Sequence, residues 1–300
     1  MADGFRLLQE AEKALAGASG GFSFFSNKES KMQDAADKFT SAAHAFRTAK
    51  KYGEAAQAFE RTAYVHGGDG NNKMLNEPDD AARNYDEASK QYRLAGMPEE
   101  AKRTLHKAAD YWYAKGNVTR AGQARGSLGE WLATQAGDNM GALEEFVTAA
   151  DYYMEDQKPA LASKWRVKAA EMSALTGNFP QAAQWYGMLA EEALQNATMK
   201  YSAKNYLFNA CLCSLALNDE VTAKRAVTKA AEMDPMFATQ PHNRLINDLI
   251  EAMFVNQDPG EFAARLQEFE RGTGSKFDNY QVAGLLAAKR AIVEADNEFA

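Results

Sequence analysis

Residue types that commonly carry chemistry are few in this chain and lie far apart. The four histidines are His44, His66, His106 and His242. No two of them have the helical spacing of a zinc site, and no cysteine joins them. The glycine-rich segment 67–72 lacks the Gly-Lys-Ser/Thr ending of a phosphate-binding loop. We therefore expect no enzymatic activity, no metal ion, no cofactor and no small-molecule substrate.

Positive charge, by contrast, gathers in one short segment. The basic residues of this segment are Lys158, Lys164, Arg166 and Lys168, with no acidic residue between positions 157 and 170. Because Lys164 and Lys168 are four residues apart, they share one face of an expected helix. The acidic residues Glu155, Asp156 and Glu171 flank the segment and weaken it.

Further basic residues lie on earlier expected helices: Lys90, Arg93, Arg120 and Arg125. If these helix faces align, they form a basic stripe that would attract an acidic partner and speed docking. The alternative is an ordinary solvated face, which is the commoner outcome for such residues. Both interpretations remain open on the charge pattern alone.

The composition narrows the class of protein. The net charge of −7 argues against nucleic acid as the main partner, and the 46% of hydrophobic residues allows a large core. Two cysteines, Cys211 and Cys213, suit a reducing compartment. The N-terminal residues show no secretory signal, and no run of 18 apolar residues could span a membrane. We expect a cytoplasmic protein.

Turn residues at near-constant spacing predict the architecture. Gly53, Gly96, Gly137, Gly177 and Asn218 are 43, 41, 40 and 41 residues apart. Glycine and asparagine accept the left-handed conformation that closes a helix, and a fixed period near 40 residues is typical of a solenoid. We predict an all-α, tetratricopeptide-like solenoid of antiparallel helical hairpins. It would occupy residues 1–234, with a C-terminal helical bundle and acidic tail at 235–300.

Alanines and aromatic residues alternate at helical spacing in the expected hairpins. One example is the expected helix 30–50, with Ala35, Phe39, Ala42 and Phe46. Alanine lets two helix axes approach closely, and an aromatic side chain from the next helix fills the remaining gap. The same pattern predicts core positions at Trp131 and Leu143.

An apolar loop interrupts the first helices. Residues 18–30 are rich in glycine and serine and carry Phe22, Phe24 and Phe25. These phenylalanines either fold back over the first helices as a cap or enter a bilayer or a partner. Lys28 and Lys31 follow, and a basic flank favours an anionic membrane surface.

The run Met-Lys-Tyr-Ser-Ala-Lys-Asn-Tyr-Leu-Phe-Asn-Ala-Cys-Leu-Cys at 199–213 resembles a signature of the soluble NSF attachment proteins, alpha type. The segments 232–237, 249–252 and 278–292 resemble that family in the same register. The resemblance implies a non-catalytic adaptor. Members of the family bind SNARE four-helix bundles through a basic concave face, and their C-terminal ends recruit and stimulate the hexameric NSF ATPase. NSF then takes the SNAREs apart for further rounds of vesicle fusion.

Roles for individual residues follow from the resemblance. Membrane contact would fall to Phe22, Phe24 and Phe25, which implies peripheral membrane association. SNARE contact would fall to Arg120, Lys164 and Lys168, and the basic stripe adds Lys90 and Arg93. NSF contact would fall to Glu294, Asp296, Glu298 and Phe299.

Two positions depart from the family pattern. Gln123 stands where the family often has lysine, and Phe299 stands where the family has a leucine needed for ATPase stimulation. Two other functions stay open, the second because of these departures. One is a tetratricopeptide-like scaffold for an unrelated peptide or helix. The other is a mimic that binds SNAREs or NSF and blocks disassembly.

Overall fold

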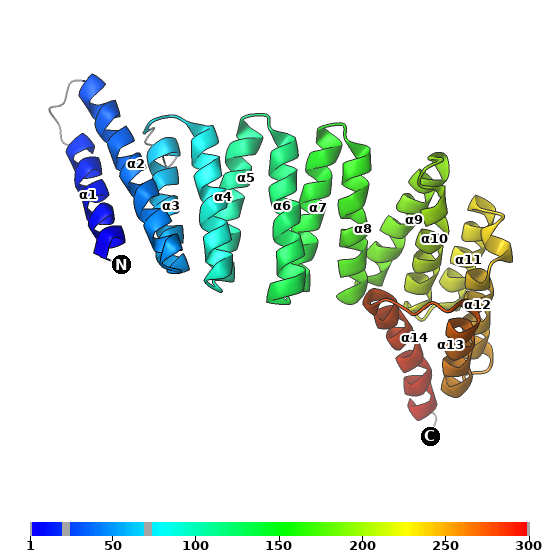
Figure 1. The fold of residues 1–300 in the computed structure, drawn as a ribbon. Helices are drawn as coiled ribbons and strands as arrows, with labels where there is room; N and C mark the ends of the chain where they lie inside the picture. The colour runs from blue at the N-terminus through cyan, green and yellow to red at the C-terminus, as the bar shows by residue number, and fades with distance from the viewer. Residues whose placement is uncertain (1, 20–24, 69–73, 299–300) are drawn as a thin grey trace. The chain divides into compact units, whose positions relative to one another are not determined.

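The computed structural model describes residues 2–19, 25–68 and 74–298, and all regular elements in these ranges are helices (Figure 1). This confirms the all-α class. The helices in chain order are α1 (Ala2–Ser19), α2 (Phe25–Thr48), α3 (Tyr52–Gly67), α4 (Pro78–Leu94), α5 (Pro98–Ala114), α6 (Val118–Trp131), η1 (Leu132–Ala136), α7 (Asn139–Glu155), α8 (Pro159–Leu175), α9 (Phe179–Gln195), α10 (Lys200–Leu215), α11 (Glu220–Met233), η2 (Phe237–Thr239), α12 (Pro241–Ile250), η3 (Glu251–Val255), α13 (Pro259–Thr273) and α14 (Asn279–Glu298).

The chain forms two compact units. The first contains residues 1–138 and 148–162, and the second contains residues 139–147 and 163–300, so that the boundary passes through α7 and α8. The division at residue 235 that the sequence suggests stays a prediction.

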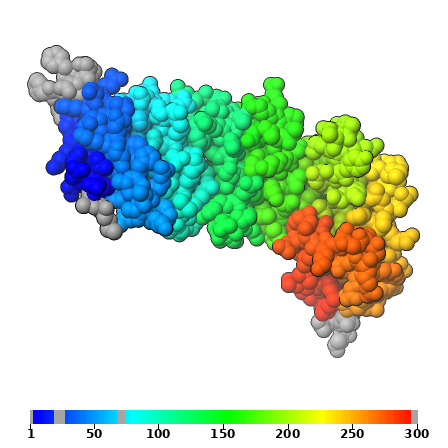
Figure 2. All heavy atoms as spheres, in the orientation of Figure 1, coloured from blue at the N-terminus to red at the C-terminus, as the bar shows by residue number. Residues whose placement is uncertain are grey.

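In the first unit each helix packs against its neighbours in the chain. Helix α1 contacts α2, α2 contacts α3, and the series continues to α6 (Figure 1). Figure 2 shows the same helices as one unbroken run of colour from blue to green. Alanine pairs such as Ala42 and Ala55 are fully buried beside Phe46 and Phe59. This packing of chain-order neighbours confirms a helical solenoid built on close alanine contacts.

One turn geometry joins the hairpins. At the end of α4, Gly96 has a φ of +71°, and the N–H of Met97 donates to the carbonyl of Tyr92 over 3.0 Å. This is the backbone bond of a Schellman motif, which satisfies carbonyls left free at a helix end. Residues with positive φ recur at Gly96, Gly116, Gly137, Gln157 and Gly177, 20 or 21 positions apart.

The first expected turn residue is wrong. Lys50, with a φ of +57°, occupies the left-handed position, whereas Gly53 lies inside the first turn of α3. The N–H of Lys51 closes the turn by donating to the carbonyl of Phe46 over 2.9 Å. A lysine adopts this conformation at a cost of about 1–2 kcal/mol. The sequence prediction therefore chose the glycine three residues later and placed the turn wrongly.

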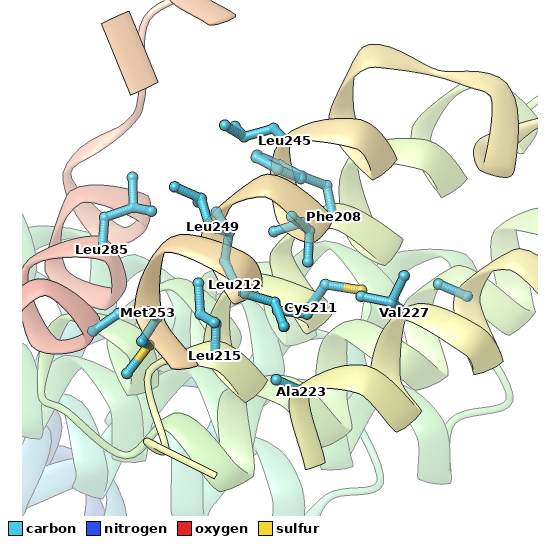
Figure 3. Close-up of a cluster of buried hydrophobic side chains, with 14 of the residues drawn as sticks. Phe208, Cys211, Leu212, Leu215, Ala223, Val227, Leu245, Leu249, Met253 and Leu285 are labelled. Carbon is cyan, nitrogen blue, oxygen red and sulfur yellow. The ribbon is translucent and has the colours of Figure 1, made fainter. Parts of the chain in front are cut away.

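The second unit contains a core that α10 organises. Figure 3 shows Phe208, Leu212 and Leu215 of α10 converging with side chains from α11, α12 and α14. The buried amide of Asn209 accepts a hydrogen bond from Gln281 Nε2 over 2.8 Å, which joins α10 to α14. The C-terminal helices therefore close over α10 as a bundle.

Three further expectations need correction. Trp131 and Leu143 are half-buried rather than in the core. The acidic tail, expected to be loose, continues α14 as far as Glu298. Phe25, expected in a loop, is the first residue of α2.

Candidate functional site

A groove of about 630 Å³ opens over α4, α5 and α6 of the first unit. Its lining residues are Arg83, Asp86, Glu87, Lys90 and Arg93 of α4, Leu105 and Trp112 of α5, and Arg120, Gln123, Ala124 and Ser127 of α6. The α4 and α6 residues recur every three or four positions, so each set occupies one face of its helix. The groove thus contains three of the five residues predicted to contact SNAREs: Lys90, Arg93 and Arg120.

Hydrogen bonds among α3, α4 and α5 hold the groove in shape. Glu60 of α3 accepts a hydrogen bond from the Tyr92 hydroxyl over 2.6 Å. It also forms a bidentate ion pair with Arg103, with both N–O distances at 2.8 Å. Ser89 of α4 also donates to the carbonyl of Ala101 of α5 over 2.8 Å. These contacts fix α4, which carries five of the lining residues, against α3 and α5.

Two of the four cations in the groove are already neutralised. Lys90 Nζ lies 2.9 Å from Asp86 and 2.7 Å from Glu87. Arg83 pairs with Asp80 over 2.6 Å. Exposed pairs of this kind contribute about 0–1 kcal/mol each, but they reduce the attraction of the groove for another anion.

Arg93 is a half-buried cation with no carboxylate in hydrogen-bond range among the described residues. Its guanidinium lies over the Trp131 ring, 5.6 Å from the ring centroid, and its Nε has no hydrogen-bond partner. Burial lowers the pKa of this guanidinium, and Asp86 opposes that shift at longer range. Trp131, predicted as a core residue, is thus half-buried and in contact with Arg93.

Arg120 repeats this arrangement on the opposite wall. Its guanidinium lies over the Trp112 ring, 5.3 Å from the centroid. Trp112 is 3% exposed, and its Nε1–H has no acceptor in the described part of the chain. Asn117 caps α6 by accepting a hydrogen bond from the N–H of Arg120 over 3.4 Å. Gln123 lies one turn further along and supplies an amide where a cation was expected.

The part of the basic segment that lies in the second unit, from Lys164 to Lys168, is largely compensated. Arg166 pairs with Glu192 over 2.7 Å, and Lys168 pairs with Glu171 over 3.1 Å. Lys164 is exposed, and its Nζ lies 4.1 Å from the centroid of the Trp165 ring. Lys164 and Lys168 project from α8, as predicted, but acidic partners reduce the local positive charge.

Sequence reasoning missed several exposed apolar side chains of the second unit. Tyr201, in the first turn of α10, is 88% exposed. Val282, Leu286 and Val293 of α14 are exposed too, at spacings of four and seven residues that put them on one helix face. The sequence signal that could have identified Tyr201 as exposed is its position two residues before Ala203, which is buried.

The terminal residues of interest are only partly described. Phe22, Phe24 and Phe299 lie outside the described residues. The backbone is helical at Phe25, Asp296 and Glu298. Glu294 is an exposed residue of α14.

One group of possible metal ligands was also missed. His66, Glu77 and Asp80 place one ligand atom each within 4.8 Å of one another. His66 Nδ1 is already hydrogen-bonded to Glu77 over 2.7 Å, and Asp80 is held by Arg83. Their ligand atoms therefore have protein partners.

In the described ranges, no helix combines the length and apolarity that crossing a bilayer requires.

Stacked helical hairpins with a basic groove define an α-solenoid of the tetratricopeptide-like class, a fold whose extended surface binds other molecules. A family model described as "Soluble NSF attachment protein, SNAP" matches residues 2–293, and the chain belongs to this family. The resemblance noted in the sequence is thereby confirmed.

Relatives extend along the whole chain. A probable vesicular-fusion protein sec17 homolog of Neurospora crassa is 40% identical over 98% of this chain and 97% of its own length. A protein of the same description from Schizosaccharomyces pombe is 33% identical over 99% of both chains. The human alpha-soluble NSF attachment protein is 29% identical over 99% of this chain and 97% of its own.

Proposed function

We propose that this protein is an adaptor that binds SNARE four-helix bundles and recruits and stimulates the NSF ATPase to disassemble them. Membership of the family along residues 2–293 is the observation that carries the proposal. The groove of the first unit and the basic face of α8 in the second unit support it, because both present cations to an acidic partner.

The contacts divide into charged and apolar ones. Lys90, Arg93 and Arg120 would meet acidic side chains at the groove, and Lys164 and Lys168 would do so on α8. Tyr201, at 88% exposure, would supply an apolar anchor. Aromatic anchors contribute more to binding than rim charges, which chiefly speed association and set orientation.

The C-terminal end would engage the ATPase. Helix α14 offers an apolar face of Val282, Leu286 and Val293 together with the carboxylate of Glu294. Asp296, Glu298 and Phe299 follow in sequence and would extend this surface. Its mixture of apolar and acidic groups suits a basic partner with an apolar recess.

Peripheral membrane contact would come from Phe22, Phe24 and Phe25. A membrane contact raises the effective concentration of the adaptor at a membrane-anchored SNARE bundle. Weak individual ion pairs can then suffice.

The deciding experiment is disassembly of a fluorescent SNARE complex by NSF and ATP, with and without this protein. Disassembly that depends on the protein supports the proposal. Binding to SNAREs without disassembly would indicate the inhibitory mimic instead. The absence of any SNARE binding would leave a scaffold for some other peptide or helix.

A further inference from the structure

The groove of the first unit has the size of a small-molecule site. It is a hollow of about 630 Å³ rather than a flat face. This volume falls within the roughly 300–1,000 Å³ typical of small-molecule sites.

Two cations of the groove lack acidic partners at hydrogen-bonding distance among the residues that the structure describes. Asp86 and Glu87 neutralise Lys90, and Asp80 neutralises Arg83, so Arg93 and Arg120 remain. Each guanidinium lies over an indole ring, Arg93 over Trp131 and Arg120 over Trp112. An arginine stacked in this way keeps the N–H groups at its edge available, an arrangement that suits bidentate recognition of phosphate.

Buried donors in the same groove lack acceptors. Within the described ranges, Trp112, at 3% exposure, has no partner for Nε1–H, and Arg93 has none for Nε–H. Buried polar groups in native structures are nearly always hydrogen-bonded, and both of these donors belong to residues that line the groove. Gln123 and Ser127 add neutral donors on the exposed face of α6.

From these observations we propose that the groove binds a compact polyphosphate, a small molecule or headgroup carrying several phosphate groups, between Arg93 of α4 and Arg120 of α6. The multiple charges of such a ligand match two arginines on separate walls. A single carboxylate satisfies only one of them. The inference goes beyond the proposed function and does not depend on it, because ligand binding is measured on this chain alone. A bound polyphosphate would compete with any acidic protein partner for the same arginines.

The test is isothermal titration of the full chain with inositol hexakisphosphate. We expect one binding site per chain, with affinity lowered about tenfold or more by Arg120→Gln and by Arg93→Gln, since each removes a charge-assisted hydrogen bond. Arg225→Gln is the matched control, because it removes the same charge from the exposed face of α11. It should leave the affinity unchanged. Arg120 is exposed, so its variant tests the site even if Arg93→Gln disturbs folding.

Two further arms separate the possible ligands. Sedimentation with phosphatidylcholine vesicles, with and without a phosphatidylinositol bisphosphate, distinguishes the source. Recruitment that Arg120→Gln abolishes supports a lipid headgroup, whereas titration binding without recruitment supports a free polyphosphate. Titration with oligoglutamate tests the protein alternative.

The proposal is overturned if inositol hexakisphosphate does not bind. It is also overturned if all three variants, including Arg225→Gln, weaken binding equally, because that result indicates non-specific attraction. Oligoglutamate that binds through Arg93 and Arg120 where the phosphate does not would assign the groove to an acidic protein. Because no SNARE or ATPase enters these measurements, failure of the proposed function cannot be confused with failure of this site.

Discussion

His242 shows how one residue can make stability depend on pH. Its ring lies edge-on to Phe208 and Phe269, at centroid distances of 4.9 and 5.1 Å. Its Nδ1 has no hydrogen-bond partner among the residues of known placement. Burial, with help from Lys204, lowers its pKa below the ordinary 6.5. The unfolded chain therefore takes up a proton at a higher pH than the folded chain does, and folding becomes less favourable as pH falls below about 6.5. Above that value this residue contributes no pH dependence.

The measurement is the urea midpoint at pH 7.5 and at a pH between 5 and 6, for the natural chain and for His242→Phe. We expect the natural chain to lose more stability on acidification than the variant, which cannot titrate at this position. Equal losses in the two proteins would show that His242 is not responsible.

The Asn209–Gln281 pair is the second residue-scale case. Gln281→Ala removes the donor to a buried oxygen of Asn209, which is 4% exposed. An unsatisfied buried acceptor costs about 1–3 kcal/mol, and we expect that loss in the free energy of unfolding by urea. Gln267→Ala on the exposed face of α13 is the control and should change stability by less than about 0.5 kcal/mol. A loss of stability no larger than that of the Gln267→Ala control would contradict the role of the hydrogen bond between Gln281 and Asn209.

At the scale of elements, replacing glycine has opposite effects on stability in the turns and in the helices. Gly177, between α8 and α9, has a φ of +80° with nothing near an added Cβ, so only backbone strain opposes alanine there. Gly187 lies inside α9, also with open space around an added Cβ. We expect Gly177→Ala to destabilise the protein by about 1–2 kcal/mol and Gly187→Ala to stabilise it by about 0.5–1 kcal/mol. Thermal melts of both variants provide the check, and shifts of the same sign would refute the assignment of the turn.

At the scale of the molecule, the local basic surfaces belong to a chain whose net charge is −7. We expect SNARE binding to weaken as salt rises, because exposed charges are screened. Combined Lys164→Glu and Lys168→Glu should lower that affinity about tenfold and leave the fold intact. A matched double variant, Lys224→Glu with Lys229→Glu on α11, should have little effect. SNARE binding by titration at low and high salt tests both expectations, and salt-independent binding would contradict them.

The sequence by itself determined the helical class, the hairpin period and most core positions. These features depend on local rules: alanine and aromatic spacing selects the buried face, and residues that tolerate positive φ end each helix. The resemblance in residues 199–213 also placed the chain in its family. The same local rules misplaced the first turn, because Lys50 adopts a conformation for which Gly53 was the obvious candidate.

Tertiary structure decided which charges are available. Lys164, Arg166 and Lys168 form a dense basic segment in the sequence, yet Glu192 and Glu171 neutralise two of them in the fold. Arg93 and Arg120, 27 positions apart, come to line one groove, each over an indole. Neither outcome follows from spacing, because pairing and burial depend on side chains that packing brings together from different helices.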